Sequence, residues 1–291
     1  MQEAPLEGRA CLVTGATSGL GLETAIGLAR LGARVTLVGR SAARGERARA
    51  RVVERSGNPR VELLLADLST QAEVRRLAAE VLAKSPRLHV LVNNAGVVNL
   101  RHTLTADGLE TTFAVNHLAY FLLANLLLPR LAESAPARIV NVASDAHRFG
   151  KLDLSDLQSE RAYRVLPVLG AMRVYSMTKL ANLLFTDELA RRVKDRGISA
   201  NAVHPGFVRS RLGENNGAAA RALLVLLRPF ALSPERGAET SIHVASAPEL
   251  EGVTGRYFAR QREATPSGAA RDRTLARQLW DASARLTGLG S

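Results

Sequence analysis

The sequence predicts an α/β protein with a single domain, in which a doubly wound parallel sheet of about seven strands is covered by helices on both faces. Two observations predict this class. Short apolar runs alternate with longer segments of helical period, and no Pro-, Gly- or Ser-rich linker divides the alternation. Strand–helix alternation at this spacing is typical of βαβ units. We therefore expect one domain over 1–291, with a core at 8–260 and a C-terminal tail at 261–291.

The predicted strands are β-branched or leucine-rich runs, and helices of amphipathic period lie between them. The strands are expected at Arg9–Thr14, Ala33–Gly39, Arg60–Ala66, Leu88–Asn93, Arg138–Ala143, Ser199–His204 and Thr254–Phe258. The helices are expected near 19–31, 41–56, 70–84, 105–130, 173–196 and 234–247. Ser41 suits a helix N-cap, and Gly32 and Gly197 suit helix C-termini. In the tail, Ala270–Leu286 predicts a basic helix that serves for packing or dimerisation.

Composition limits the alternatives. The 291 residues are 46% hydrophobic, and this share is near the average for soluble globular proteins. Disordered and coiled-coil chains are therefore excluded. Cys11 is the only cysteine, so an intramolecular disulfide and a cysteine-rich zinc site are excluded as well, and we expect no metal.

The net charge of +12 raises the question of nucleic acid. Residues 40–60 hold seven arginines against Glu46 and Glu54. Aromatic residues make up only 4% of the chain, and no helix-turn-helix, zinc-finger or RNP-like pattern is present. Scattered arginines usually form a solvated surface, so we expect no nucleic-acid partner.

No secretory signal is recognised at residues 1–8, which lack an apolar region. The longest uncharged stretch, 111–129, includes Asn116, His117 and Asn125. These polar residues favour a buried helix over a membrane span. We therefore expect a cytoplasmic protein without a transmembrane segment.

Two stretches interrupt the alternation, at 145–172 and 207–233. Both follow the carboxyl ends of predicted strands, where open parallel sheets bind ligands. The second contains the apolar run Ala222–Leu227. We expect both to form walls of a substrate pocket, and the alternative is a pair of surface excursions.

A glycine-rich loop follows the first predicted strand. Gly15, Gly19 and Gly21 form the pattern G-x-x-x-G-x-G, and a helix is predicted to follow. Such a loop turns tightly and brings backbone N–H groups close to a pyrophosphate at a helix N-terminus. This context predicts a Rossmann-type dinucleotide site formed by Gly15, Thr17, Ser18, Gly19, Leu20 and Gly21. The alternative is a packing role for these glycines.

The end of the second strand selects the dinucleotide. An acidic residue there would bind the ribose hydroxyls of NAD(H) and repel a 2′-phosphate. Here the strand ends at Arg40 and Ser41, and Arg44 follows on the next helix. A guanidinium forms charge-assisted hydrogen bonds with phosphate, so these residues predict NADP(H). The alternative is a set of solvated arginines.

Tyr175 and Lys179 are four residues apart on a predicted helix and so share one face. A nearby ammonium would lower the pKa of the phenol toward a useful range for proton transfer. Ser144, at the end of the fifth strand, could hydrogen-bond a substrate carbonyl oxygen, and Asn116 could anchor a water near Lys179. Taken singly, these are ordinary turn, core and packing residues; together they predict a catalytic site.

These residues resemble the short-chain dehydrogenases/reductases, over about residues 8–260. The resemblance rests on the TGATSGLG loop at 14–21, Asp67 and Leu68, the Asn93–Gly96 motif, Asn116, Ser144, Tyr175, Lys179 and the His204–Gly206 motif. The stretches 175–192 and 202–208 look most like the branch of retinol dehydrogenases and protochlorophyllide reductases.

The resemblance implies roles on the adenosine side of a cofactor. Asp67 would hydrogen-bond the adenine amino group, with Leu68 beside the ring. Asn93 and Gly96, with Ala95 between them, would line the adenosine side and support the central strands.

On the nicotinamide side, the resemblance implies that Tyr175 is the proton donor or acceptor and that Lys179 binds the ribose. Ser144 would orient the carbonyl, and Asn116 would hold a proton-relay water. The segment Pro205, Gly206, Phe207 and Val208 would contact the carboxamide, and Ser210 stands where the family commonly has threonine.

We therefore expect an NADP(H)-dependent oxidoreductase of a hydrophobic carbonyl or alcohol substrate. The apolar residues Leu223, Val225, Leu226 and Phe230 suggest the substrate pocket. Three alternatives stay open: an epimerase or light-driven reductase of the same family, a non-catalytic NADP-binding regulator, and a peripheral membrane enzyme that lies on lipid through 218–232. Family analogy implies a homo-oligomer.

Overall fold

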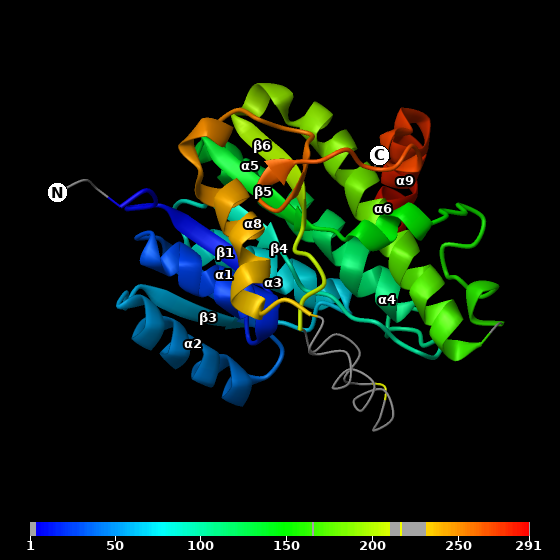
Figure 1. The fold of residues 1–291 in the computed structure, drawn as a ribbon, viewed down its shortest axis with the longest axis horizontal. Helices are drawn as coiled ribbons and strands as arrows, with labels where there is room; N and C mark the ends of the chain where they lie inside the picture. The colour runs from blue at the N-terminus through cyan, green and yellow to red at the C-terminus, as the bar shows by residue number, and fades with distance from the viewer. Residues whose placement is uncertain (1–3, 165, 210–215, 217–230, 291) are drawn as a thin grey trace.

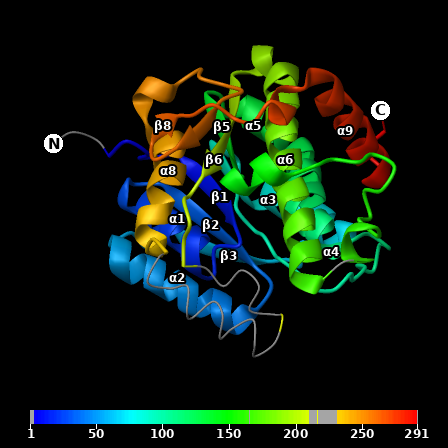
Figure 2. The same ribbon diagram turned by 45° about the vertical axis from the view of Figure 1, so that its right-hand side comes forward.

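The computed structural model describes residues 4–164, 166–209, 216 and 231–290. Its strands form one eight-stranded sheet in the order β3-β2-β1-β4-β5-β6-β7-β8 (Figures 1 and 2). They are β1 (Ala10–Thr14), β2 (Arg34–Gly39), β3 (Val61–Leu65), β4 (Val90–Asn93), β5 (Ala137–Val142), β6 (Ile198–His204), β7 (Tyr257–Ala259) and β8 (Arg262–Glu263). The predicted α/β class is confirmed.

The sheet has eight strands, close to the predicted number of about seven. Each predicted strand overlaps an observed one, and the pairs from β3 through β7 are all parallel. The eighth strand, β8, pairs antiparallel with β7 through Phe258–Glu263 and Ala259–Arg262. Arg260 and Gln261 have positive φ in the tight turn between them. A two-residue strand of charged side chains leaves no hydrophobic period to detect.

The helices are α1 (Gly19–Arg30), α2 (Ala42–Ser56), α3 (Gln71–Lys84), α4 (Thr111–Phe113), α5 (Ala119–Glu133), α6 (Pro167–Arg192), α8 (Pro234–Ser246) and α9 (Arg273–Leu286). Helices α1, α2 and α8 pack on one face of the sheet and share a core with it, whereas α3, α5 and α6 pack on the other (Figures 1 and 2). Strand β1 shows the alternation: Cys11 and Val13 face the first layer, and Leu12 faces the second.

Two predicted helices have different bounds in the structure. The segment predicted at 105–130 begins at Thr111, because Glu110 caps its first turn by accepting hydrogen bonds from the N–H groups of Thr112 and Phe113. It continues through a π-helical turn at Ala114–Leu118 into α5. The helix predicted at 173–196 begins earlier, with Pro167 in its first turn, where the missing N–H costs nothing.

The segment Thr111–Glu133 has the length and hydropathy of a membrane span, but 78% of its most apolar window is buried in the fold. Its apolar side chains contact the sheet and neighbouring helices in the second layer. The prediction of a buried core helix is confirmed for this segment.

The predicted cap residues lie at the ends of helices, but the predicted N-cap makes no capping hydrogen bond. Ser41 is the N-cap of α2, yet its side chain makes no capping hydrogen bond. Gly32 follows the C-cap of α1 with φ +91°, and Gly197 takes the left-handed conformation after the short turn Lys194–Arg196.

The tail forms α9, which packs along α6 on the outside of the second layer (Figure 2). The Trp280 ring stands edge-on to Phe121 of α5, with ring centres 4.8 Å apart, and stacks on Phe185 of α6 at 5.9 Å. The guanidinium of Arg192 lies over the outer side of the indole, 4.2 Å from its centre. The predicted helix is therefore a packing element of the same chain.

We expect Trp280→Ala to lower the free energy of unfolding by about 3–5 kcal/mol, because it removes the buried ring that joins α5, α6 and α9. Arg277→Ala, on the exposed side of α9, should change it by less than about 0.5 kcal/mol. Urea unfolding of both variants checks this. An equal effect of the two substitutions would show that α9 is not anchored through its indole.

Candidate active site

The predicted site residues gather at the carboxyl edge of the sheet, where five neighbouring strands end. The glycine loop follows β1, Arg40 follows β2, Asn94 follows β4, Ser144 follows β5, and Pro205 follows β6. The strand order reverses between β1 and β4, because the chain builds β2 and β3 on one side of β1 and β4 to β7 on the other. Such a switch point is where open α/β sheets bind ligands.

The glycine loop fits against the end of β4 only because it lacks side chains there. Gly15 has φ +65°, and a Cβ on it would lie 2.8 Å from the Cα of Ala95. A Cβ on Gly21 would lie 2.4 Å from the side-chain nitrogen of Asn94. Gly19 differs, since a Cβ there would meet nothing within 4 Å. Gly15 and Gly21 therefore allow close packing, and Gly19 leaves open space before the N-terminus of α1.

Asn94 joins this loop to β4, a role that the sequence analysis did not assign. Its side-chain nitrogen donates to the Thr14 carbonyl at 2.8 Å. In return, the Thr14 hydroxyl oxygen accepts from the N–H groups of Asn94 and Ala95 at 2.9 and 3.1 Å. Asn94 lies within the Asn93–Gly96 motif, so its position was visible in the sequence although its partner was not.

The end of β2 is close to the glycine loop. A Cβ on Gly39 would lie 2.3 Å from the methyl group of Thr17, so the loop packs directly on the strand end. Beyond it, Arg40 is exposed, and Ser41 and Arg44 are partly exposed. Within the described part of the chain, neither arginine forms an ion pair.

The residues after β3 and β4 divide between surface and core. Asp67 is exposed and accepts from the N–H of Ser69 at 3.0 Å, whereas Leu68 is buried. Asn93 is fully buried, and its side chain donates to Asn141 on the adjacent strand at 2.9 Å. Of the two implied roles of Asn93, the structure shows the support of the central strands. Gly96 and Ala95 are partly exposed at the loop that follows.

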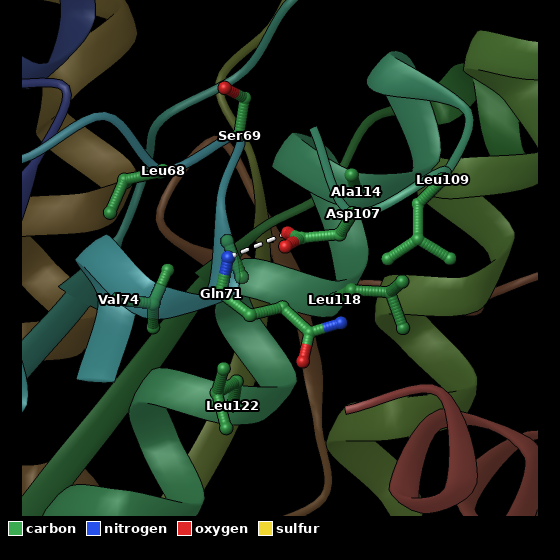
Figure 3. A pocket seen from close by; sticks show the side chains of 10 residues that line it. Leu68, Ser69, Gln71, Val74, Asp107, Leu109, Ala114, Leu118 and Leu122 are labelled. Carbon is green, nitrogen blue, oxygen red and sulfur yellow. Dashed lines mark hydrogen bonds between the residues drawn. The ribbon is translucent and has the colours of Figure 1, made fainter. Parts of the chain in front are cut away.

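A small cavity adjoins Leu68 on the side of α5 and measures only about 10 Å³ (Figure 3). The N–H of Gln71 donates to Asp107 at 2.8 Å beside it. A cavity of this size holds about one water. A larger cavity, about 280 Å³, is lined by residues of α6 and by Tyr257 and Arg271. Neither is lined by Ser144, Tyr175 or Lys179, so the candidate site rests on those residues and not on a cavity.

Asn116 lies fully buried in the π-helical turn. Its amide oxygen accepts from the N–H of Val97 at 2.8 Å, and its nitrogen donates to the Val97 carbonyl and to the Thr178 hydroxyl. Thr178 in turn donates to the Tyr175 carbonyl at 2.8 Å. Asn116 therefore ties the loop after β4 to the helix turn that carries Tyr175.

Helix α6 brings Tyr175 and Lys179 together as its period predicts. The Lys179 ammonium lies 5.6 Å from the centre of the Tyr175 ring and 5.9 Å from that of Tyr120. It donates to the carbonyl of Val142, the last residue of β5, at 2.9 Å. Tyr120 is a further neighbour that the sequence analysis missed; its hydroxyl donates to the Ala95 carbonyl at 2.7 Å.

The pKa values of this pair correct the predicted direction. Burial raises the pKa of Tyr175, and a hydrogen bond with Ser144 lowers it by less. Burial also lowers the pKa of Lys179 to about 7. The prediction that Lys179 lowers the pKa of Tyr175 is therefore wrong here, because the low-dielectric surroundings disfavour both charged forms and Ser144 is the neighbour that favours the phenolate.

Ser144 lies two residues after the end of β5 and caps the 3₁₀ turn Asp145–Phe149. Its side-chain oxygen accepts from the N–H of Ala146 at 3.2 Å. A hydroxyl that already accepts through its oxygen keeps its proton for donation, either to Tyr175 or to a substrate oxygen. The Ser144 hydroxyl therefore has a proton available for donation beside the tyrosine.

The segment after β6 lies across the same edge of the sheet. Gly206 has φ +86°, and a Cβ on it would lie 2.6 Å from Leu232. Val208 pairs with Leu232 in a parallel bridge and packs on Gly237 of α8. Pro205 and Gly206 are half-buried, and Phe207 is exposed.

Several predicted residues lie outside the described residues. These are Ser210, the run Ala222–Leu227 with Leu223, Val225 and Leu226, Phe230, and most of 218–232.

Comparisons with known proteins place the chain in a family. A family model described as short chain dehydrogenase matches residues 9–155. Retinol dehydrogenase 12 of Mus musculus is 43% identical over 288 residues, covering 98% of this chain and 88% of that protein. Retinol dehydrogenase 11 of Homo sapiens is 44% identical over 284 residues, covering 98% and 87%.

Solved structures of other proteins share the fold of this chain. An uncharacterised protein from Mycobacterium Paratuberculosis matches with a TM-score of 0.77 and 34% identity, covering 97% of this chain and 94% of that one. RhlG of Pseudomonas aeruginosa, solved as an NADP active-site complex, matches with a TM-score of 0.69 and 27% identity, covering 93% and 100%.

The lowered pKa of Lys179 predicts a pH-dependent stability. In the unfolded chain this ammonium titrates near ~10.4, whereas in the folded protein it titrates at about 7. Between these values the unfolded chain binds a proton that the folded protein does not, so the free energy of unfolding rises with pH. We expect the wild type to gain stability relative to Lys179→Met from pH 7 to pH 10, measured by urea unfolding without cofactor. A difference that stays constant with pH would contradict the lowered pKa.

Proposed function

We propose a function on the basis that the chain belongs to the short chain dehydrogenase family, in a branch with the retinol dehydrogenases, and is an oxidoreductase of CH–OH and C=O groups. In this proposal, it is an NADP(H)-dependent enzyme that uses Tyr175 as its proton donor or acceptor. One observation supports this most: Ser144, Tyr175 and Lys179 meet at the switch-point edge of the sheet, where the glycine loop also leaves β1.

The residues present fit a dinucleotide. Gly19 opens onto free space at the N-terminus of α1, and Ser18, the N-cap, makes no side-chain capping bond there. The first N–H groups of a helix carry partial positive charge and suit a pyrophosphate. The loop residues from Gly15 to Gly21 would hold that group, with Asp67 and Leu68 near the adenine.

Charge at the end of β2 supports NADP(H) over NAD(H). Arg40 and Arg44 carry guanidinium groups without ion-pair partners among the described residues, and Ser41 lies between them with no capping hydrogen bond from its side chain. A 2′-phosphate supplies the anion that these groups lack. Because NADP complexes occur among the structural relatives, the proposal agrees with what such folds accept.

The proton chemistry follows from Tyr175 and Ser144. When bound, the nicotinamide supplies or accepts the hydride at the reacting carbon. In reduction, Tyr175 gives its hydroxyl proton to the substrate oxygen while Ser144 donates a hydrogen bond to that oxygen. The raised pKa of Tyr175 keeps the phenol protonated at neutral pH, which suits reduction. Lys179, with its pKa of about 7, exchanges protons readily near neutral pH.

Exposed apolar side chains support a hydrophobic substrate. Val168 and Met172 lie seven and three residues before Tyr175 on α6, so they share its side of the helix. Phe149 and Phe207 are also exposed, on the loops that follow β5 and β6. Exposed apolar side chains stabilise an apolar ligand that covers them, because the contact removes apolar surface from water. We propose a carbonyl or alcohol substrate with a large apolar part.

The cytoplasmic location and the homo-oligomeric state are further proposals, and the second follows from family analogy. Sedimentation of the purified protein tests the second. An epimerase or a light-driven reductase would bind the same cofactor but leave no net NADPH consumption in the dark. A regulator would bind NADPH without turnover, and a lipid-bound enzyme would float with liposomes.

We expect Tyr175→Phe to lower kcat for carbonyl reduction by about 100-fold or more, because the proton donor is lost. NADPH binding, measured by fluorescence, should change by less than about threefold, since the ring stays in place. Ser176→Ala, one residue along α6, is the matched control. Retention of most of the activity in the phenylalanine variant would remove Tyr175 from the mechanism.

We expect Arg40→Asp to lower the ratio of kcat/KM for NADPH to that for NADH by about 10- to 100-fold, because a charged hydrogen bond to phosphate is replaced by repulsion. Steady-state kinetics with both cofactors measures this ratio. Arg49→Asp, farther along α2 where Glu46 pairs with the arginine, serves as the control for overall charge. An unchanged preference in Arg40→Asp would contradict the assignment.

A further inference from the structure

A polar cluster holds the turn that carries Ser144, and the reaction above does not use it. Asp145 and His147 follow Ser144 on the turn, and His204 and Tyr257 face them from β6 and β7. The cluster joins three segments of the chain, the turn after β5 and the strands β6 and β7. The contacts in this cluster hold atoms of Asp145 and His147, which lie one and three residues after Ser144 in the sequence.

Asp145 connects the turn with the strands on its far side. Its carboxylate accepts from the Tyr257 hydroxyl at 3.0 Å and lies 3.5 Å from Nε2 of His204. Its own N–H donates to Nδ1 of His204 at 3.3 Å. Arg148 donates to the same carboxylate and to the Thr265 carbonyl. His204 directly precedes Pro205, so Asp145 bridges the Ser144 turn and the proposed nicotinamide loop.

His147 is the second anchor. It is fully buried, and its ring stands edge-on to Tyr257 with centres 5.3 Å apart. Its Nδ1 lies 2.7 Å from the Ser144 carbonyl, and its Nε2 accepts from the N–H of Ser267 at 3.0 Å. This pair of contacts requires a proton on Nδ1 and none on Nε2.

Both histidines therefore hold the turn in their neutral forms. His204 accepts through Nδ1 and presents Nε2–H to Asp145, and protonation of Nδ1 would break its bond to the backbone. Burial lowers the pKa of both rings, which favours these neutral forms. The charged or titratable groups that act on His204 are Asp145, His147, Arg148 and Arg260.

We propose that Asp145 is a positioning residue for Ser144, acting through His204 and Tyr257, with His147 as the anchor on the other side of the turn. The inference rests on the proposed function, in which Ser144 orients the substrate oxygen and favours the phenolate of Tyr175. Asp145 touches neither reactant, so its effect must pass through Ser144.

The test is a double-mutant cycle of Asp145→Asn with Ser144→Ala. Asparagine keeps the shape and one oxygen to accept from Tyr257 and Arg148, but it replaces the second carboxylate oxygen, 3.5 Å from Nε2 of His204, with an NH₂ group that cannot accept. We expect Asp145→Asn alone to lower kcat for carbonyl reduction about tenfold. In the Ser144→Ala background, it should cost less than about twofold more, because residues that act through one group are not additive.

A second readout does not need turnover. Loosening Ser144 removes the hydrogen bond that lowers the pKa of Tyr175, so Asp145→Asn should raise the pKa of Tyr175 by about half a unit, in the same direction as Ser144→Ala. Ultraviolet difference titration of tyrosinate, with the matching Tyr175→Phe protein subtracted, measures this. Tyr257→Phe, which keeps the ring in the core, should raise it as well.

Asp153→Asn is the matched control. Asp153 lies in the same 145–172 stretch, its side chain is 54% exposed against 51% for Asp145, and it also pairs with an arginine. The proposal is overturned if Asp145→Asn behaves like Asp153→Asn in the titration, or if its cost persists in full without the Ser144 hydroxyl. Absence of turnover with every carbonyl would instead refute the proposed function and leave the titration to decide the positioning role.

Discussion

The fold and the candidate site both depend on the close contact between the bend after β1 and the chain after β4. Side chains at Gly15 or Gly21 would overlap with Ala95 or Asn94, and the Thr14 hydroxyl accepts from two N–H groups on the β4 side. This contact fixes the two strands at which the sheet reverses its order. Everything that the site needs is then placed by strand ends on either side of that point.

The same contact explains why the glycine loop can be recognised from sequence, whereas the residues after β4 that hold it in place cannot. Glycines leave a local pattern, and so do a strand before them and a helix after them. The parallel strands, the loop and the Tyr175–Lys179 pair follow from such local periods, and the structure contains all of them. Asn94, Tyr120 and Asp145 act through partners that are 59 or more residues away, or on another layer, and no local period marks those contacts.

The pKa of Tyr175 was predicted in the wrong direction for a related reason. The spacing of Tyr175 and Lys179 shows that they share a face, but it does not show how much water reaches them. In the structure Lys179 is buried with its ammonium on the Val142 carbonyl, so the cost of desolvation exceeds any benefit to the phenolate. Spacing predicts proximity, and burial decides the sign of the electrostatic effect.

The tail shows how the outer layer reaches the site. Ser283 of α9 hydrogen-bonds the buried His117 at 2.9 Å, and His117 directly follows Asn116 in the π-helical turn. Asn116 in turn holds Val97 and the Thr178 that contacts the Tyr175 turn. The bond from α9 holds the π-helical turn on one side, and the bonds of Asn116 hold it on the other. Such turns inside α-helices are frequent at functional sites. The basic tail contains none of the motifs that predicted the site. It is nevertheless joined to the candidate site through the buried side chains of His117 and Asn116.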